Sequence, residues 1–306
     1  MGILGAPDVD WGIAVDGGQA LFVPGGTVRA TISLRPRQNL DARRVMAALV
    51  GTEEYQYSER EYDDEGSSSS TSWGSSEVGR QEVQLMGPGT IIGGVPIGGP
   101  VELAVPPAAS PSFESKVLRV RWELVAWVDV GGRDPKLEQP IAVALTAAQL
   151  DASDAASMGP QVQLVSGGQP VSLWAQPAPL RSGAPFSGAL DVMTALPLAD
   201  AHAELRLNAA TSGSGGLPVA TLLAIGGISS TSRGGVSDSQ VLWRGGLTDG
   251  GMVGEWHRYL FAGQVPPGAV TAVFPHGSAT ATLDIVISRR LRPDAHITRP
   301  VAIVSG

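Results

Sequence analysis

The sequence predicts an all-β protein built from two tandem β-sandwich domains, and three observations support this prediction. Forty glycines and twenty-three prolines among 306 residues indicate many tight turns, because these residues supply the backbone angles that turns require. Apolar residues alternate with polar ones in many segments, which is typical of half-buried strands. The third observation is an internal repeat that relates the first half of the chain to the second.

Alternation and flanking turn residues predict about seven strands in each domain. The strand segments expected in the first half are residues 11–15, 20–23, 27–34, 44–57, 82–85, 100–105, 117–130 and 140–145. Trp122 and Trp127 are an odd number of residues apart on one of these strands, so their side chains should lie on opposite faces. One of the two is therefore expected in the core.

The repeat is clearest in residues 25–51, which align with residues 183–209 at a shift of 158. Both segments have the same period-two pattern. Further along, Pro106-Pro107 matches Pro266-Pro267 at a shift of 160. Shifts that stay between 158 and 161 over more than a hundred residues are hard to obtain from shared composition alone.

This repeat predicts two homologous domains, residues 1–148 and residues 161–306. Residues 149–160, where alternation stops and small polar residues dominate, are expected to form a short linker. A single large sandwich is the alternative.

Charge and cysteine content exclude several classes of function. The net charge of -8 and the absence of a Lys/Arg run argue against nucleic acid and against anionic membranes, both of which need a basic surface. Because the chain has no cysteine, it contains no disulfide, no thiolate metal site and no cysteine nucleophile. With no predicted signal peptide or transmembrane segment, the protein is expected to be cytoplasmic.

A combination of motifs in residues 105–127 resembles the arrestin family. This stretch, VPPAASPSFESKVLRVRWELVAW, has a Pro106-Pro107 turn, a PSF loop ending at Phe113 and a long alternating strand. Residues 25–34, GGTVRATISL, are similar to the same family, and the second half repeats the pattern with a weaker PSF equivalent that ends at Val273. No PPxY motif follows the proline pairs, so recruitment through WW domains is not expected.

The resemblance implies two seven-stranded, immunoglobulin-like sandwiches joined by a short hinge, with prokaryotic arrestin-like proteins of the sporulation-control type as the nearest relatives. It also implies a non-catalytic adaptor or scaffold that binds other proteins and needs no cofactor. Phe113 is expected to close one end of its sandwich.

The acidic and serine-rich residues 52–80 contain the candidate partner-binding residues. These are Glu53, Glu54, Glu59, Glu61, Asp63, Asp64, Glu65 and Trp73. Three interpretations remain open: a flexible hairpin tip, a docking loop that attracts a protein with a basic face and anchors it on Trp73, or a calcium site. In the second half, residues 226–240 are equally rich in turn residues and are expected to form a loop.

No motif predicts catalytic or metal-binding residues. The four histidines, His202, His257, His276 and His296, lack the spacing of a metal site, and no nucleophile elbow, HExxH or phosphate-binding glycine loop is present. Two other functions compete with the adaptor. One is a lectin-like or enzyme-associated sandwich that binds a ligand or a metal, and the other is a homo-oligomeric structural protein that uses exposed strand edges.

Overall fold

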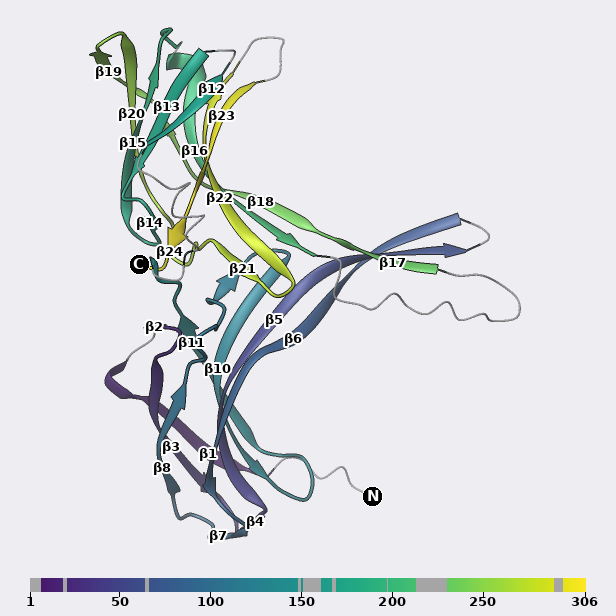
Figure 1. Ribbon diagram of the computed structural model, residues 1–306. Coiled ribbons are helices and arrows are strands. Elements are labelled where there is room, and N and C mark those ends of the chain that lie inside the picture. The colour runs from purple at the N-terminus through teal and green to yellow at the C-terminus, as the bar shows by residue number, and fades with distance from the viewer. Residues whose placement is uncertain are drawn as a thin grey trace. The chain divides into compact units, whose positions relative to one another are not determined.

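The computed structural model describes residues 7–18, 21–63, 66–147, 150, 161–166, 169–196, 198–212, 230–288 and 294–306 (Figure 1). Regular structure in this part of the chain is almost entirely β-strand, and its helical turns are short, such as Asp16–Gly18 and Leu198–Asp200. The predicted all-β class is confirmed. None of the described helices is long and apolar enough to cross a membrane.

The chain forms two compact units. The N-terminal unit contains Met1–Glu54, Ser75–Ser112 and Arg119–Ala144, and the C-terminal unit contains Tyr55–Gly74, Phe113–Leu118 and Leu145–Gly306. The predicted linker, residues 149–160, lies outside the described residues apart from Leu150, so the predicted domain boundary stays a prediction.

The N-terminal unit is built from two main sheets. The first has the order β1 (Val9–Val15), β3 (Thr27–Pro36), β8 (Ile97–Ala104), and the second contains β5 (Arg44–Asp63), β10 (Leu118–Asp129), β11 (Lys136–Val143) and β2 (Leu21–Phe22), with β6 (Gly66–Met86) paired to β5. A further pair joins β4 (Leu40–Ala42) to β7 (Gly89–Ile91).

Alternation places the core of this unit as the sequence predicts. On β3, Val28, Ile32 and Leu34 are buried while the residues between them are exposed. On β10, the Trp122 ring is buried and its Nε1 donates a hydrogen bond to the Ser110 carbonyl oxygen at 2.9 Å. Trp127 lies on the opposite face, with the Arg80 guanidinium 5.9 Å from its ring centroid. The prediction for the two tryptophans is therefore confirmed.

The C-terminal unit also has two main sheets. One has the order β12 (Gln161–Ser166), β13 (Gln169–Gln176), β15 (Pro185–Val192), β20 (Trp256–Gln264), β19 (Thr248–Val253). The other joins β18 (Ser237–Gly246), β16 (Ala201–Thr211), β22 (Gly277–Ile287) and β21 (Ala272–Phe274), with β23 (Ala295–Val301) also paired to β22. The core of the unit includes the buried Phe186 and Phe261 rings. The half-buried Trp243 ring lies between them, 5.1 Å from Phe186 and 6.4 Å from Phe261, centroid to centroid.

The order of strand pairing in the first half of the chain recurs in the second. The series β1, β3, β8 corresponds to β13, β15, β20, and the hairpin β5–β6 next to β10 corresponds to β16–β18 next to β22. The parallel pair of β2 with β11 corresponds to the parallel pair of β14 (Leu180–Arg181) with β24 (Ile303–Val304). A duplicated chain would show this recurrence.

The PSF loop and its counterpart meet inside the C-terminal unit. Phe113 is buried and lies 5.2 Å, centroid to centroid, from the buried Phe274. The sequence alignment ended the counterpart at Val273, but that side chain is 82 % exposed. Phe274 occupies the buried position because alternation along β21 turns Val273 outward.

Two segments that were expected to be loops form strands instead. In the acidic and serine-rich residues 52–80, β5 continues to Asp63 and β6 begins at Gly66. In residues 226–240, β17 (Ser230–Gly235) and the start of β18 are strands. Polar composition did not prevent strand formation, because these segments pair with one another or with neighbouring strands and so satisfy their backbone groups.

Candidate functional site

The acidic and serine-rich segment forms an arm of the C-terminal unit. We define the arm as Tyr55–Gly74, which contains one end of β5 and of β6, together with β17. β17 pairs antiparallel with residues 57–62 of β5, as Figure 1 shows. Since β6 also pairs with β5, the arm is a three-stranded ribbon with β5 in the middle.

The first residues of the arm are held by hydrogen bonds and a ring stack. Thr211 Oγ1 donates to the Gln56 carbonyl oxygen at 2.7 Å, and the Gln56 amide donates to the Val117 carbonyl oxygen at 2.8 Å. The Tyr55 ring stacks on His276, with centroids 4.1 Å apart and planes inclined by 5°. The arm therefore starts from a fixed position on its own unit.

Two of the predicted site residues lie in the N-terminal unit rather than on the arm. Glu53 is buried there. Glu54 lies 3.8 Å from Arg119 Nη1 and 3.9 Å from Arg121 Nη1. Two arginines of β10 therefore lie within ion-pair distance of Glu54 inside the N-terminal unit.

On the arm itself, Glu59 and Trp73 are placed on different strands. The Glu59 carboxylate accepts a hydrogen bond of 3.0 Å from Arg233 of β17, and the Arg233 guanidinium lies 4.6 Å from the centroid of Tyr57. Trp73 is on β6 and is 42 % exposed. Of these two residues, Trp73 presents the larger accessible apolar surface.

The other predicted residues lie at the tip of the arm. Glu61 and Asp63 are on β5 by their backbone, and Asp64 and Glu65 lie outside the described residues. In the rest of the chain that the structure describes, no three His, Asp or Glu side chains are close enough together to hold a metal ion. The calcium interpretation concerns this tip, whose side chains are outside that part.

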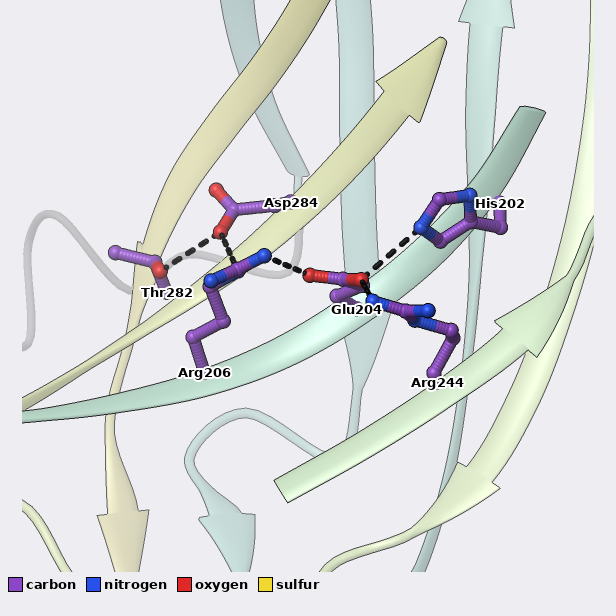
Figure 2. A network of polar contacts seen from close by, with 6 residues as sticks. All are labelled: His202, Glu204, Arg206, Arg244, Thr282 and Asp284. Atoms are coloured by element: carbon purple, nitrogen blue, oxygen red, sulfur yellow. Dashed lines mark hydrogen bonds and ion pairs between the residues drawn. The ribbon is translucent and has the colours of Figure 1, made fainter. Parts of the chain in front are cut away.

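A network of charged side chains that the sequence analysis did not find lies on β16, β18 and β22 (Figure 2). Glu204 is at its centre and is 1 % exposed. Its carboxylate contacts Arg206 and Arg244, and His202 Nε2 lies 3.0 Å from Oε1. Arg206 Nε also lies 3.5 Å from Asp284 Oδ2, so the two buried acids share one guanidinium.

Local cations keep Glu204 ionised in this setting. Burial by itself raises the pKa of Glu204, but hydrogen bonds from His202 and Arg244 and the charge of Arg206 outweigh it and lower the pKa overall. A carboxylate held charged by bound arginines is a poor proton donor or acceptor near neutral pH. The network therefore holds Glu204 as a charged, hydrogen-bonded group on this face of the sheet.

The sequence analysis also did not predict a groove beside strands β13, β15, β19 and β20. The Arg258 guanidinium makes two hydrogen bonds to Asp191, 2.7 and 2.8 Å long, and lies 5.4 Å from the centroid of Trp174. The pair raises the pKa of Arg258 through hydrogen bonding to Asp191. Beside Trp174 is a groove of about 540 Å³, lined by residues that include Trp174, Ser187, Gly246, Thr248, Leu260 and Ala262.

The sequence indicates which side chains of the network share one face of β16, but not that they lie beside Asp284 of β22. His202, Glu204 and Arg206 alternate with Ala203 and Leu205, which belong to the period-two apolar pattern of residues 183–209. They therefore had to share the other face of the strand. Their meeting with Asp284 depends on the pairing of β16 with β22, which puts Glu204 directly opposite Asp284.

Neither a protein-family model nor a curated protein matches the chain.

Proposed function

We propose that the chain is a non-catalytic, arrestin-like adaptor of the cytoplasm, and that the arm is the element with which it binds a protein partner. The observation that carries this proposal is the excess length of the arm strands. β5 and β6 have 20 and 21 residues, whereas their counterparts β16 and β18 have 11 and 10.

The extra length adds little to the core. None of the described side chains of β6, residues 68–86, is buried. Exposed strands cost conformational entropy without burying apolar surface, so packing alone does not account for them. Exposed elements on a rigid scaffold are common positions for recognition residues.

The recurring order of strand pairing supports the arrestin-like part of the proposal. Two sandwiches with the same pairing order are what the resemblance in residues 105–127 implies. Fold alone does not define function, so the arm remains the basis of the adaptor proposal.

The proposal is tested by shortening the arm. Because the Gly74 backbone lies against the Tyr55 ring, replacing residues 59–70 by an Asn-Gly turn should leave a short hairpin with its original pairing. Wild-type protein and this variant are used as baits in a lysate of the source organism, and the captured proteins are compared by mass spectrometry. The control bait carries Val273→Ala, at an exposed position outside the arm.

We expect partners that bind the wild type and the control but are lost from the shortened variant. If all three baits retain the same partners, the arm is not the binding element and the proposal is wrong. Equal melting temperatures of the three baits show that any loss is not caused by unfolding.

A second candidate function, carbohydrate binding, is favoured by the groove beside Trp174. An aromatic ring held by an ion pair, next to the hydroxyls of Ser187 and Thr248, offers both a stacking surface and hydrogen-bonding groups. A glycan array should then give signals that Trp174→Ala abolishes and Trp73→Ala preserves. An array without signals for the wild-type protein contradicts this function.

A further inference from the structure

The groove beside Trp174 is a trough that crosses one face of a sheet. β13, β15 and β20 are neighbours in this sheet, and Phe186 and Phe261 are buried on its core side. Side chains at paired positions of antiparallel strands share a face, and the face alternates along each strand. The register therefore assigns the side chains of the other face to successive rows, each of which crosses the strands.

Two adjacent rows form the wall and the floor of the trough. The wall row has large side chains at Trp174 and Leu260 and continues to Thr248. The floor row has small side chains, with Ser187 directly opposite Ala262. All five residues line the groove of about 540 Å³, which is a volume typical of small-ligand sites. The groove therefore results from the difference in side-chain size between the two rows.

An ion pair holds the wall from its other side. Asp191 and Arg258 occupy paired positions in the row on the far side of Trp174 from the floor. Two hydrogen bonds of 2.7 and 2.8 Å join them, and the Arg258 guanidinium lies 5.4 Å from the centroid of the Trp174 ring. The ring is thus positioned by a pair of charges that bind each other.

The floor of the trough differs from the matching positions of the N-terminal unit. At the shift of 158, Ser187 matches Arg29. Ser187 lies opposite Ala262, whereas Arg29 lies opposite Glu102 and forms an ion pair of 3.0 Å with it. The N-terminal unit therefore has two long side chains where the C-terminal unit has two small ones.

The wall differs in the same comparison. Ala189, in the wall row, matches Thr31 at the shift of 158. The residue that pairs with Ala189 on β13 is Trp174. The residue that pairs with Thr31 on β1 is Ala14. One sandwich therefore forms with alanine at this position, so the duplicated fold does not by itself require the tryptophan.

The side chains that line the trough determine which ligand it suits. Trp174 and Leu260 offer apolar surface. The Ser187 hydroxyl can donate and accept hydrogen bonds, and Thr248 Oγ1, which donates to the Leu260 carbonyl oxygen at 3.2 Å, can still accept one. No charged residue is among the described residues that line the groove. A charged ligand would lose hydration there without gaining a counter-charge.

We infer that the trough binds an uncharged glycan, with one sugar ring against Trp174 and hydroxyls directed at Ser187 and Thr248. A sugar ring has apolar C–H groups on its face and hydroxyls at its rim, which match the apolar wall and the hydroxyls beside it. This inference rests on the carbohydrate-binding function given above as the second candidate. It specifies the class of glycan and excludes acidic and amino sugars.

The first test is a glycan array that presents uncharged, carboxylated, sulfated and amino glycans to the full chain. We expect signals from uncharged glycans. Isothermal titration calorimetry with the uncharged glycan of strongest signal should give affinities that agree within about twofold at 20 and 200 mM salt, because salt screens only charged partners. Stronger signals from acidic or amino glycans overturn the inference.

A double variant, Ser187→Arg with Ala262→Glu, fills the trough. It copies the ion pair of Arg29 with Glu102 from the N-terminal unit, where the same pairing position accommodates both side chains. We expect a melting temperature close to that of the wild type and a loss of affinity for the uncharged glycan of roughly tenfold or more. Unchanged affinity of the folded variant overturns the inference.

The matched control for this variant is Thr27→Arg with Ala104→Glu. It adds the same two side chains at an exposed cross-strand pair outside the trough, and it should bind the glycan as the wild type does. Two changes at Trp174 keep the test informative if the double variant unfolds. Trp174→Phe should retain most of the affinity and Trp174→Ala should lose roughly tenfold or more, whereas equal affinities of the two overturn the inference.

Failure of this inference and failure of carbohydrate binding give different results. If the array favours acidic glycans and Trp174→Ala abolishes their signals, the carbohydrate-binding function stands and the uncharged class is wrong. If the array gives no signal, the carbohydrate-binding function itself is wrong. An empty array together with protein partners that the Ser187→Arg, Ala262→Glu bait loses from a lysate would assign the groove to a protein and contradict both.

Discussion

At the scale of single residues, Glu204 shows how the C-terminal unit holds buried charge. Its carboxylate is 1 % exposed but contacts three cationic or hydrogen-bonding side chains, His202, Arg206 and Arg244. Removing the acid would leave two guanidiniums without their main acceptor. The cost is limited because Arg206 and Arg244 are 33 % and 61 % exposed and can turn to water.

We expect Glu204→Gln to lower the free energy of unfolding at pH 7 by about 1–3 kcal/mol. Because the pKa of Glu204 is lowered in the folded protein, its stabilising effect is full above the ordinary glutamate pKa, about 4.3, and is lost as the pH falls through the folded pKa. Urea titrations between pH 7 and pH 3 should therefore show the two proteins converging in acid.

The exposed pair of Arg29 with Glu102 provides the control for this measurement. Glu102→Gln should change stability by less than about 0.5 kcal/mol. A Glu204→Gln difference that stays constant down to pH 3 would contradict the account of Glu204.

Gly51 and Gly79 are required by the Trp122 ring. A Cβ atom at either position would lie 2.7 Å from the ring carbons, closer than real side chains approach. Trp122 is 1 % exposed and cannot move into free space.

Gly79→Ala should accordingly destabilise the protein by about 1–3 kcal/mol through overpacking. Gly131→Ala is the matched control, because nothing lies within 4 Å of its Cβ position. Thermal unfolding of both variants, followed by circular dichroism, checks the expectation, and equal melting temperatures would refute it.

At the scale of elements, the arm depends on a few polar contacts at its start. Thr211 is 8 % exposed, donates to the Gln56 carbonyl oxygen and accepts a hydrogen bond of 2.9 Å from the Val236 amide. Thr211 thereby links Gln56 of β5 to Val236, the residue that follows β17. Loss of the hydroxyl would leave both backbone groups without this partner.

Thr211→Val should therefore increase opening of the arm by about 1–2 kcal/mol. Hydrogen–deuterium exchange should become faster in residues 55–62 and 230–236 and stay unchanged in β20. Thr280→Val is the control, because that exposed hydroxyl donates a long hydrogen bond, 3.5 Å, to the Asn208 carbonyl oxygen. Unchanged exchange in the arm of Thr211→Val would show that the hydroxyl does not hold it.

At the scale of the whole molecule, the C-terminal unit includes two segments from the first half of the chain. Tyr55–Gly74 and Phe113–Leu118 belong to it, although they precede residue 148. Phe113 packs on Phe274, and the Leu118 side chain lies against Gly277. The unit is therefore not encoded by one continuous segment.

A fragment of residues 161–306 should be less stable than the same unit in the full chain. Without Phe113 and the end of β5, Phe274 loses its ring partner and β17 loses its only described neighbour. We expect a lower melting temperature and stronger binding of a hydrophobic dye than in the full chain. A fragment that melts at the temperature of the full chain would contradict this division.

Much of the fold follows from the sequence, because period-two burial is a local property. The buried positions of β3 and β10, and the opposite faces of Trp122 and Trp127, can be assigned from alternation alone. The same reasoning shows that His202, Glu204 and Arg206 share one face. The repeat predicts which strands should correspond, and the pairing order agrees with it.

The candidate site could be predicted only in part, because its residues are brought together by strand pairing. Composition identified residues 52–80 as the candidate site. It could not predict that Glu54 lies beside Arg119 and Arg121. Nor could it predict that Glu59 pairs with Arg233, which is 174 residues further along the chain. Long-range pairing depends on register between strands distant in the chain, which local propensity does not encode. The sequence by itself determined the strands and their inward faces, because alternation is a local property. The tertiary structure alone decided which acids lie beside arginines, because those arginines are on strands distant in the chain.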